Sequence, residues 1–199
     1  MKVMKYLPHP GIIAALVIVL MTLEPLIPTY LVSWIAFQTW ALYFISGGTP
    51  QQGIKAGACY ICGILAAILI MVLAKALGAT LGSATLPLVC STVTFAAICF
   101  EKVKPLDNIP AWFIGAGAYF GLANVQGANF HYGPAMVTVV STLVIGMLLG
   151  FITVTLRTKY GAWADADMTP VDEAPTPSPA ALQVAPVLIT TTDNLTSNQ

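Results

Sequence analysis

Charged residues are scarce in this chain. Only 8% of its 199 residues are Asp, Glu, Lys or Arg, whereas 57% are hydrophobic. Soluble domains keep about a quarter of their residues charged because their surfaces face water. The apolar residues fall in long runs rather than alternating stripes, which is typical of a chain surrounded by lipid. The formal net charge is zero, so nothing indicates a nucleic-acid partner. These properties predict an integral membrane protein with the lipid bilayer as its partner.

The features that carry enzyme chemistry are also missing. The sequence has no glycine-rich phosphate loop, no nucleophile with an attendant base and no metal-binding constellation. Cys59 and Cys62 have the spacing of a metal-ligand pair, but there is no second pair to complete a tetrahedral site. All four cysteines fall inside apolar runs, where they behave as small packing residues. We therefore expect no enzyme, no catalytic residues, no metal and no cofactor.

Six apolar runs predict an all-α, polytopic membrane protein with about six transmembrane or partly spanning helices. The runs cover residues 11–23, 31–45, 56–74, 86–100, 109–123 and 134–156. The runs at 11–23 and 109–123 are short, and the latter covers only about 22 Å of a hydrocarbon core of about 30 Å. We expect a transmembrane domain over residues 1–160. Residues 161–199 are acidic and rich in Pro and Thr, which predicts a disordered cytoplasmic tail.

The basic residues indicate the orientation. If the N-terminus is cytoplasmic and six helices cross, only Lys75 faces outward. Cytoplasmic loops are enriched in Lys and Arg, so this arrangement predicts a multi-pass protein with both termini in the cytoplasm. The basic residues then on the cytoplasmic side are Lys2, Lys5, Lys55, Lys102, Lys104, Arg157 and Lys159.

One aromatic pattern occurs twice. Phe37-x5-Tyr43-Phe44 returns 76 residues later as Phe113-x5-Tyr119-Phe120, and the same offset places Gly57 over Gly133. Each copy runs into a polar, glycine-rich break, at residues 46–53 and 124–133. Three helices per repeat is an odd number, so the second repeat must be inverted relative to the first. Inverted pairs of broken helices commonly build a conduit through a membrane. We therefore expect two inverted three-helix repeats whose breaks form the opposite mouths of one path.

These breaks give the candidate site residues. The aromatic residues fit either a belt at the membrane interface or a paired constriction, and the polar group after the second copy fits either a pore mouth or an ordinary loop. The expected pore-lining residues are Phe37, Gln38, Thr39, Tyr43, Phe44, Phe113, Tyr119 and Phe120. The expected pore-mouth residues are Asn124, Gln126, Asn129 and His131.

The apolar runs contain no deeply placed Asp, Glu, Lys or Arg. Coupled carriers usually keep ionisable groups near the middle of the membrane. A neutral pore also offers an anion little to offset its lost hydration, a penalty on the order of several kcal/mol. This absence favours a passive channel for a small neutral molecule. A bicarbonate transporter remains an alternative, and so does a non-transporting membrane assembly partner that tethers soluble proteins through its tail.

The segment from Trp34 to Gly48, together with Gly53-x3-Gly57 and Phe113-Ile114-Gly115, resembles a family of small membrane proteins from bacteria and algae. Most members of that family are of unknown function, and the resemblance covers roughly residues 10–157. The opening Met1–Pro10 and the chain length are similar to its algal members, the low-carbon-dioxide-inducible plasma-membrane proteins of green algae. This resemblance implies a plasma-membrane homotrimer in which each subunit is a carbon dioxide channel. Such a channel would support inorganic-carbon uptake in a carbon-concentrating mechanism.

Overall fold

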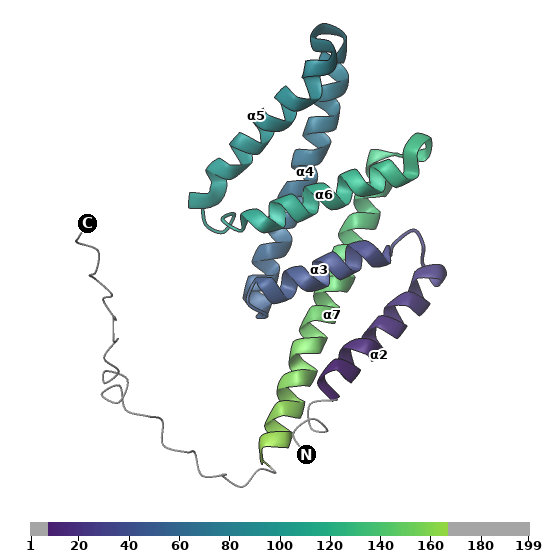
Figure 1. Cartoon of the computed structure of the whole chain (residues 1–199), viewed down its shortest axis with the longest axis vertical. Helices are drawn as coiled ribbons and strands as arrows, with labels where there is room; N and C mark the ends of the chain where they lie inside the picture. Colours follow the sequence, from purple (N-terminus) through teal and green to yellow (C-terminus); the bar gives the residue numbers. More distant parts are fainter. Residues whose placement is uncertain (1–7, 167–199) are drawn as a thin grey trace, which may run out of the picture.

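A computed structural model describes residues 8–166, and all regular structure in this range is helical. Short 3-10 turns follow α2, α4, α5 and α6. The α-helices, labelled as in Figure 1, are α2 (Pro8–Leu23), α3 (Ser33–Ile45), α4 (Pro50–Leu81), α5 (Thr85–Cys99), α6 (Ile109–Gln126) and α7 (Tyr132–Ala166). Each of the six apolar runs corresponds to one helix, which confirms the all-α fold class.

The first break is shorter than the sequence predicts. Thr49 has an extended backbone, and its hydroxyl oxygen accepts a hydrogen bond from the backbone N–H of Gln52 at 3.4 Å. This N-cap, with Pro50 in the first turn, starts α4 before Gly53 is reached. The expected break at residues 46–53 is therefore wrong in extent, because residues 50–53 are helical. The backbone outside the helices is limited to Ser46–Thr49, where Gly47 and Gly48 have positive φ.

The second break is also shortened. α6 continues to Gln126 and ends where Gly127 takes a φ of 52°, which places Asn124 and Gln126 in the last turn of the helix. A 3-10 turn, Gly127–Asn129, follows, and α7 begins at Tyr132. The expected break at residues 124–133 is thus mostly helical. The two residues of this segment that lie outside any helix are Phe130 and His131.

The last helix extends past the expected end of the membrane domain. α7 remains helical to Ala166, so residues 161–166 continue the helix rather than begin the tail. Most of the predicted tail, residues 167–199, and the predicted cytoplasmic Lys2 and Lys5 lie outside the described residues.

Glu24 fixes the start of α3. The turn after α2 is a 3-10 helix, Glu24–Leu26. From there the Glu24 carboxylate accepts hydrogen bonds from the backbone N–H of Ser33 at 3.0 Å and from the Ser33 hydroxyl at 2.6 Å. These two bonds lower the pKa of Glu24. A carboxylate at a helix N-terminus also complements the positive end of the helix dipole.

Two helix crossings form the centre of the molecule. α3 packs across α7, and α6 packs across α4 (Figure 1). Glycines bring the backbones together at both crossings: a Cβ at Gly63 would lie 2.0 Å from the Trp112 carbonyl oxygen, and one at Gly146 would lie 2.6 Å from that of Ala36. Small residues allow this kind of close approach between apolar helices. A buried hydrogen bond from the Trp40 indole to the Thr153 hydroxyl, 3.1 Å long, also joins α3 to α7.

The first three helices and the last three have matching arrangements. In Figure 1 a half-turn of the picture brings α2, α3 and α4 onto the positions and directions of α5, α6 and α7. The crossing contacts correspond as well, with Ala36 matching Trp112 and Gly146 matching Gly63. The first pair is 76 positions apart and the second pair 83. An offset of 76 therefore aligns α3 with α6, whereas α4 and α7 need an offset of 83. For this reason Gly57 is not the counterpart of Gly133.

Two segments are long and apolar enough to cross a membrane, as judged by length and composition. They are residues 50–102, which take in the hairpin of α4 and α5, and residues 132–161 of α7. Residues 10–26 form a shorter apolar helix. The core between the crossings is built from buried aromatic and aliphatic side chains, among them Tyr60, Ile64, Tyr119 and Val139.

Candidate functional site

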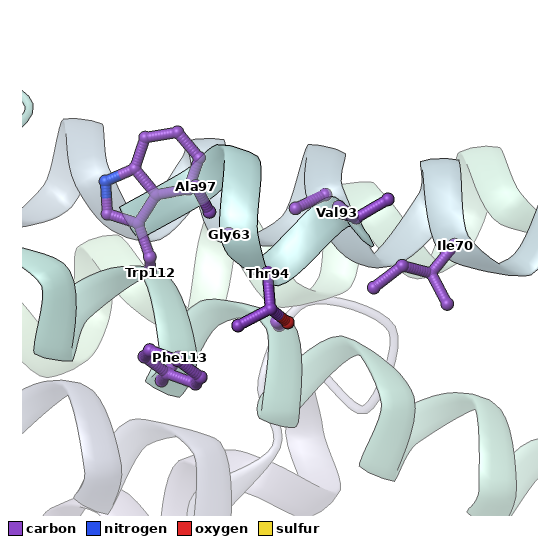
Figure 2. Close-up of a pocket in the computed structure, with 9 residues that line it drawn as sticks. Gly63, Ile70, Val93, Thr94, Ala97, Trp112 and Phe113 are labelled. Carbon is purple, nitrogen blue, oxygen red and sulfur yellow. The ribbon is translucent and has the colours of Figure 1, made fainter. Parts of the chain in front are cut away.

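A small cavity lies where α4, α5 and α6 meet, and we call it the inner cavity. Its volume is about 40 Å³. Figure 2 shows the Trp112 ring extending toward Ala97 of α5, whereas Phe113 extends from the same turn of α6 in another direction. The lining residues are Gly63, Ala66 and Ile70 from α4, Val93, Thr94 and Ala97 from α5, and Trp112, Phe113 and Ala116 from α6.

Trp112 is held in place from several sides. Its backbone touches Gly63, and its indole N–H donates a 3.1 Å hydrogen bond to the carbonyl of Leu106. Its ring stacks on Phe100, with the ring centroids 5.5 Å apart. The indole N–H is thus satisfied by the loop before α6, and the Trp112 ring serves as a fixed apolar wall.

A second hollow lies between α4 and α5 and is also lined by Trp112. This α4–α5 hollow has a volume of about 260 Å³. It shares Ala66, Val93, Ala97 and Trp112 with the inner cavity. The remaining lining residues are Cys62, Leu65, Leu69, Ala96 and Phe100. The two spaces are therefore neighbours that share part of their lining.

A third space, the α3–α6 groove, adjoins the inner cavity through Phe113, which lines both. Its volume is about 410 Å³. The other lining residues are Gln38, Ala41, Leu42, Ile45, Ile114 and Gly117. Two consecutive residues in the first half of α6, Trp112 and Phe113, thus connect the lining of three neighbouring spaces.

The chemistry of these spaces is apolar and uncharged. Among the described residues that line the three, none is Asp, Glu, Lys, Arg or His, and the polar side chains are Gln38, Thr94 and Cys62. The three spaces are open to the outside of the chain, and an apolar lining of this kind favours small apolar molecules over ions. Residues 8–166 also contain no group of three or more His, Cys, Asp or Glu that could hold a metal ion. The arrangement can admit small neutral solutes, and it provides no charge to receive an ion.

An ion pair and two hydrogen bonds hold the loop before α6 against the first half of the chain. Lys55 pairs with Asp107 at 2.5 Å, and the Asn108 amide donates a 3.2 Å hydrogen bond to the Ser46 hydroxyl. The Cys59 thiol donates to the Pro105 carbonyl at 3.5 Å. Lys55 keeps the pKa of Asp107 below its usual range, and so this carboxyl group stays ionised. The loop that binds the Trp112 indole is thereby anchored to α4 and to the end of α3.

The eight expected pore-lining residues are divided between the surface and the core. Phe37, Phe44 and Phe113 are 38%, 38% and 53% exposed, and Gln38 is exposed as well. Thr39, Tyr43 and Tyr119 are buried, and Phe120 is half-buried against the core. The structure brings Gln38 and Phe113 together in the α3–α6 groove. It does not gather all eight into a single constriction.

Tyr43 and Tyr119, the repeated tyrosines, have different partners. The Tyr119 hydroxyl donates to the carbonyl of Tyr132 at 2.9 Å, and its ring makes an edge contact with Phe130 at 5.6 Å. Tyr43 packs between two glycines, since a Cβ at Gly53 or Gly150 would lie within 3 Å of it. Within the described residues its buried hydroxyl has no hydrogen-bond partner.

The four expected mouth residues lie at the end of α6 and in the turn after it. Asn124, Asn129 and His131 are exposed, and Gln126 is half-buried. The His131 ring nitrogen Nδ1 lies 2.8 Å from the Asn129 carbonyl oxygen, and this contact closes the turn locally. None of these four residues lines the inner cavity, the α4–α5 hollow or the α3–α6 groove.

Comparison with protein-family models gives one match. It covers residues 11–157 and is described as "Protein of unknown function (DUF1097)". The chain belongs to the DUF1097 family. Neither a curated protein nor a solved structure matches it. The DUF1097 region includes every residue that lines the inner cavity, the α4–α5 hollow and the α3–α6 groove.

Sequence reasoning missed the DUF1097 residues that shape the inner cavity. Trp112 has no counterpart of the same residue type in the other repeat, where Ala36 occupies the matching place, and the counterpart of Gly63, Gly146, lies 83 rather than 76 positions away. A search for identical pairs therefore passes over them. The usable signal was the position of Trp112, directly before the repeated Phe113.

Proposed function

We propose that this DUF1097 chain is a multi-pass plasma-membrane protein whose six helices cross the bilayer wholly or in part. Two segments have the length and composition of spans, and large apolar side chains such as Ile54 and Phe95 are more than 70% exposed on the described chain. A soluble monomer rarely exposes so much apolar surface. The half-turn relation between α2–α4 and α5–α7 supports two inverted repeats.

The loop contacts support a cytoplasmic location for both termini. The Lys55–Asp107 ion pair and the Asn108–Ser46 hydrogen bond bring the first break and the α5–α6 loop to the same end of the molecule. That loop also carries Lys102 and Lys104. A basic cluster at one end is the distribution expected of the cytoplasmic side.

With this topology, the proposed function is a passive channel for a small neutral solute, and carbon dioxide is the proposed substrate. The observation that carries the proposal is the uncharged lining of three adjoining spaces around Trp112 and Phe113 in the described chain. Bicarbonate would lose its hydration there, at a cost on the order of several kcal/mol, with no cation to compensate. Lys55 is already paired with Asp107, so its charge is largely neutralised.

The resemblance to low-carbon-dioxide-inducible plasma-membrane proteins of green algae supports carbon dioxide over other neutral solutes. It also supports a homotrimer with one path in each subunit, acting in inorganic-carbon uptake. These finer assignments come from the resemblance and not from the geometry of one chain.

The test is stopped-flow acidification of proteoliposomes that contain carbonic anhydrase. We expect carbon dioxide pulses to acidify the interior faster than in protein-free vesicles, whereas bicarbonate pulses do not. Gly117→Leu should slow the carbon dioxide response, because an added side chain at Gly117 meets nothing within 4 Å and extends into the α3–α6 groove. Phe113→Ala should speed it by removing the wall between the groove and the inner cavity.

Gly57→Leu is the matched control. It is the same substitution at another helical glycine with open space, and Gly57 lines none of the three spaces. Carbon dioxide rates equal to those of protein-free vesicles would contradict the proposal. Bicarbonate uptake that follows the membrane potential would favour the transporter instead.

A further inference from the structure

A larger groove lies between α4 and α7, away from the inner cavity. Its volume is about 630 Å³. The α4 residues that line it recur every three or four positions and so form one face of the helix. The lining residues are Pro50, Gly53, Ile54, Gly57, Ala58 and Ile61 from α4, Leu143, Val144, Met147, Leu148 and Phe151 from α7, and Tyr43 from α3.

From these features we infer that the α4–α7 groove binds one acyl chain of an anionic phospholipid. This inference requires that the chain lies in a membrane, but it does not depend on carbon dioxide passage. The groove is far too large for a three-atom solute, and its lining side chains are apolar apart from Tyr43, whose hydroxyl is buried. A flexible hydrocarbon chain fits both its size and its chemistry.

The length and position of the groove match one leaflet. Pro50 to Ile61 covers about 17 Å along α4, close to half of a hydrocarbon core of about 30 Å. Pro50 is the first residue of α4 and adjoins the first break, so one end of the groove lies at a surface of the membrane. The other end, at Ile61 and Leu143, lies 11 residues from the first residue of each helix, which is about 17 Å along the helix axis. An acyl chain that enters from the surface would therefore end near the bilayer midplane.

Polar groups near the surface end fit the rest of a lipid. Tyr43 is only 3% exposed, and in residues 8–166 its hydroxyl has no hydrogen-bond partner. Buried hydroxyls normally have partners, and a small turn of the ring, which lines the groove, would present this hydroxyl to a lipid ester carbonyl. On α7, Lys159 follows Leu148 by three helical turns and so extends the face that lines the groove. Its ammonium group is exposed and suits a lipid phosphate.

The test uses the full-length protein in phosphatidylcholine vesicles that contain phosphatidylglycerol with a photoactivatable diazirine in its acyl chain. After illumination, mass spectrometry locates the labelled peptides. We expect labelling concentrated on the α4 and α7 segments that line the groove. Gly57→Leu should abolish it, because a side chain at Gly57 has open space and would fill the groove.

Gly117→Leu is the control, since it fills the α3–α6 groove instead. Thermal unfolding midpoints of Gly57→Leu and Gly117→Leu show whether either variant has a folding defect. Ala58→Phe is a second variant whose added side chain fills the α4–α7 groove. Lys159→Gln should remove the preference for phosphatidylglycerol over a phosphatidylcholine probe. Labelling spread evenly over exposed apolar positions such as Phe95, or unchanged in Gly57→Leu and Ala58→Phe, would overturn the inference. So would protein–protein cross-links through these residues, which would assign the groove to a second copy of the chain.

Discussion

Glu24 is the residue whose role changed most between sequence and structure. The sequence presents it as a charge that marks the end of the first apolar run, beside two prolines. In the structure both carboxylate oxygens accept hydrogen bonds from Ser33 and so cap the helix that follows. The partner lies nine positions away across an irregular turn, so no short-range capping pattern reveals it.

This cap predicts a pH-dependent loss of stability in Glu24→Gln. The cap contributes about 0.5–2 kcal/mol by the usual range for helix N-caps. Since folding lowers the pKa of Glu24, its stabilisation is complete above the ordinary carboxyl pKa and is lost as the pH falls through the lowered value. We expect the variant to unfold at a lower temperature at neutral pH and to converge with wild type in acid. Thermal unfolding in detergent from neutral to acidic pH measures the difference in unfolding temperature between the variant and wild type. A difference that grows as the pH falls would contradict the prediction.

The repeated aromatic residues show the limit of sequence reasoning at the residue scale. Phe37 and Tyr43 were placed on one path, but Phe37 stacks on Trp40 near the surface whereas Tyr43 is buried between α4 and α7. In a helix that is apolar on every side, periodicity does not separate the face toward lipid from the face toward the core. That separation requires the neighbouring helices.

At the scale of elements, the helices were predictable and their ends were less so. The apolar runs locate the six α-helices of residues 8–166, because apolar runs of this length and composition favour helices in lipid. The breaks were overestimated, since Gln51, Gln52 and Asn124 are polar residues inside helices. Polar residues alone do not set the helix boundaries: the Thr49 cap begins α4, and the positive φ of Gly127 ends α6.

The crossing of α3 and α7 gives a prediction at this scale. Thr153→Val keeps the shape of the side chain but leaves the Trp40 indole N–H buried without its acceptor. Such a group costs about 1–3 kcal/mol, so we expect a lower unfolding temperature. Combining Trp40→Phe with Thr153→Val should lose less than the sum of the two single variants. Additive losses in this double-mutant cycle would show that the hydrogen bond contributes no coupling.

At the scale of the whole molecule, two loops that are far apart in the sequence meet at one end. The contacts of Lys55 with Asp107 and of Ser46 with Asn108 bring two distant loops to one end. The distribution of the basic residues predicts that Lys55, Lys102 and Lys104 lie on the same side, but it does not show which groups are in contact. The three spaces around α6 were not predictable, because they depend on contacts between residues some fifty positions apart, such as Gly63 and Trp112.

We expect single cysteines introduced into a variant lacking Cys59, Cys62, Cys90 and Cys99 to label according to side. Lys104→Cys should react with a charged, membrane-impermeant maleimide only in inside-out vesicles, because its loop lies on the proposed cytoplasmic side. Lys75→Cys, near the far end of α4, should react only in right-side-out vesicles. Reaction of both from the same side would contradict the proposed topology and the inverted repeats together.

Gly63 and Gly146 leave no room for a methyl group between crossing backbones. Homologues that carry alanine or serine at either place must therefore hold the two helices farther apart, and the space beside the crossing would change with that separation. Among DUF1097 relatives, the identity of these two residues would thus indicate how closely the crossing helices approach each other, and an alignment would be enough to show it.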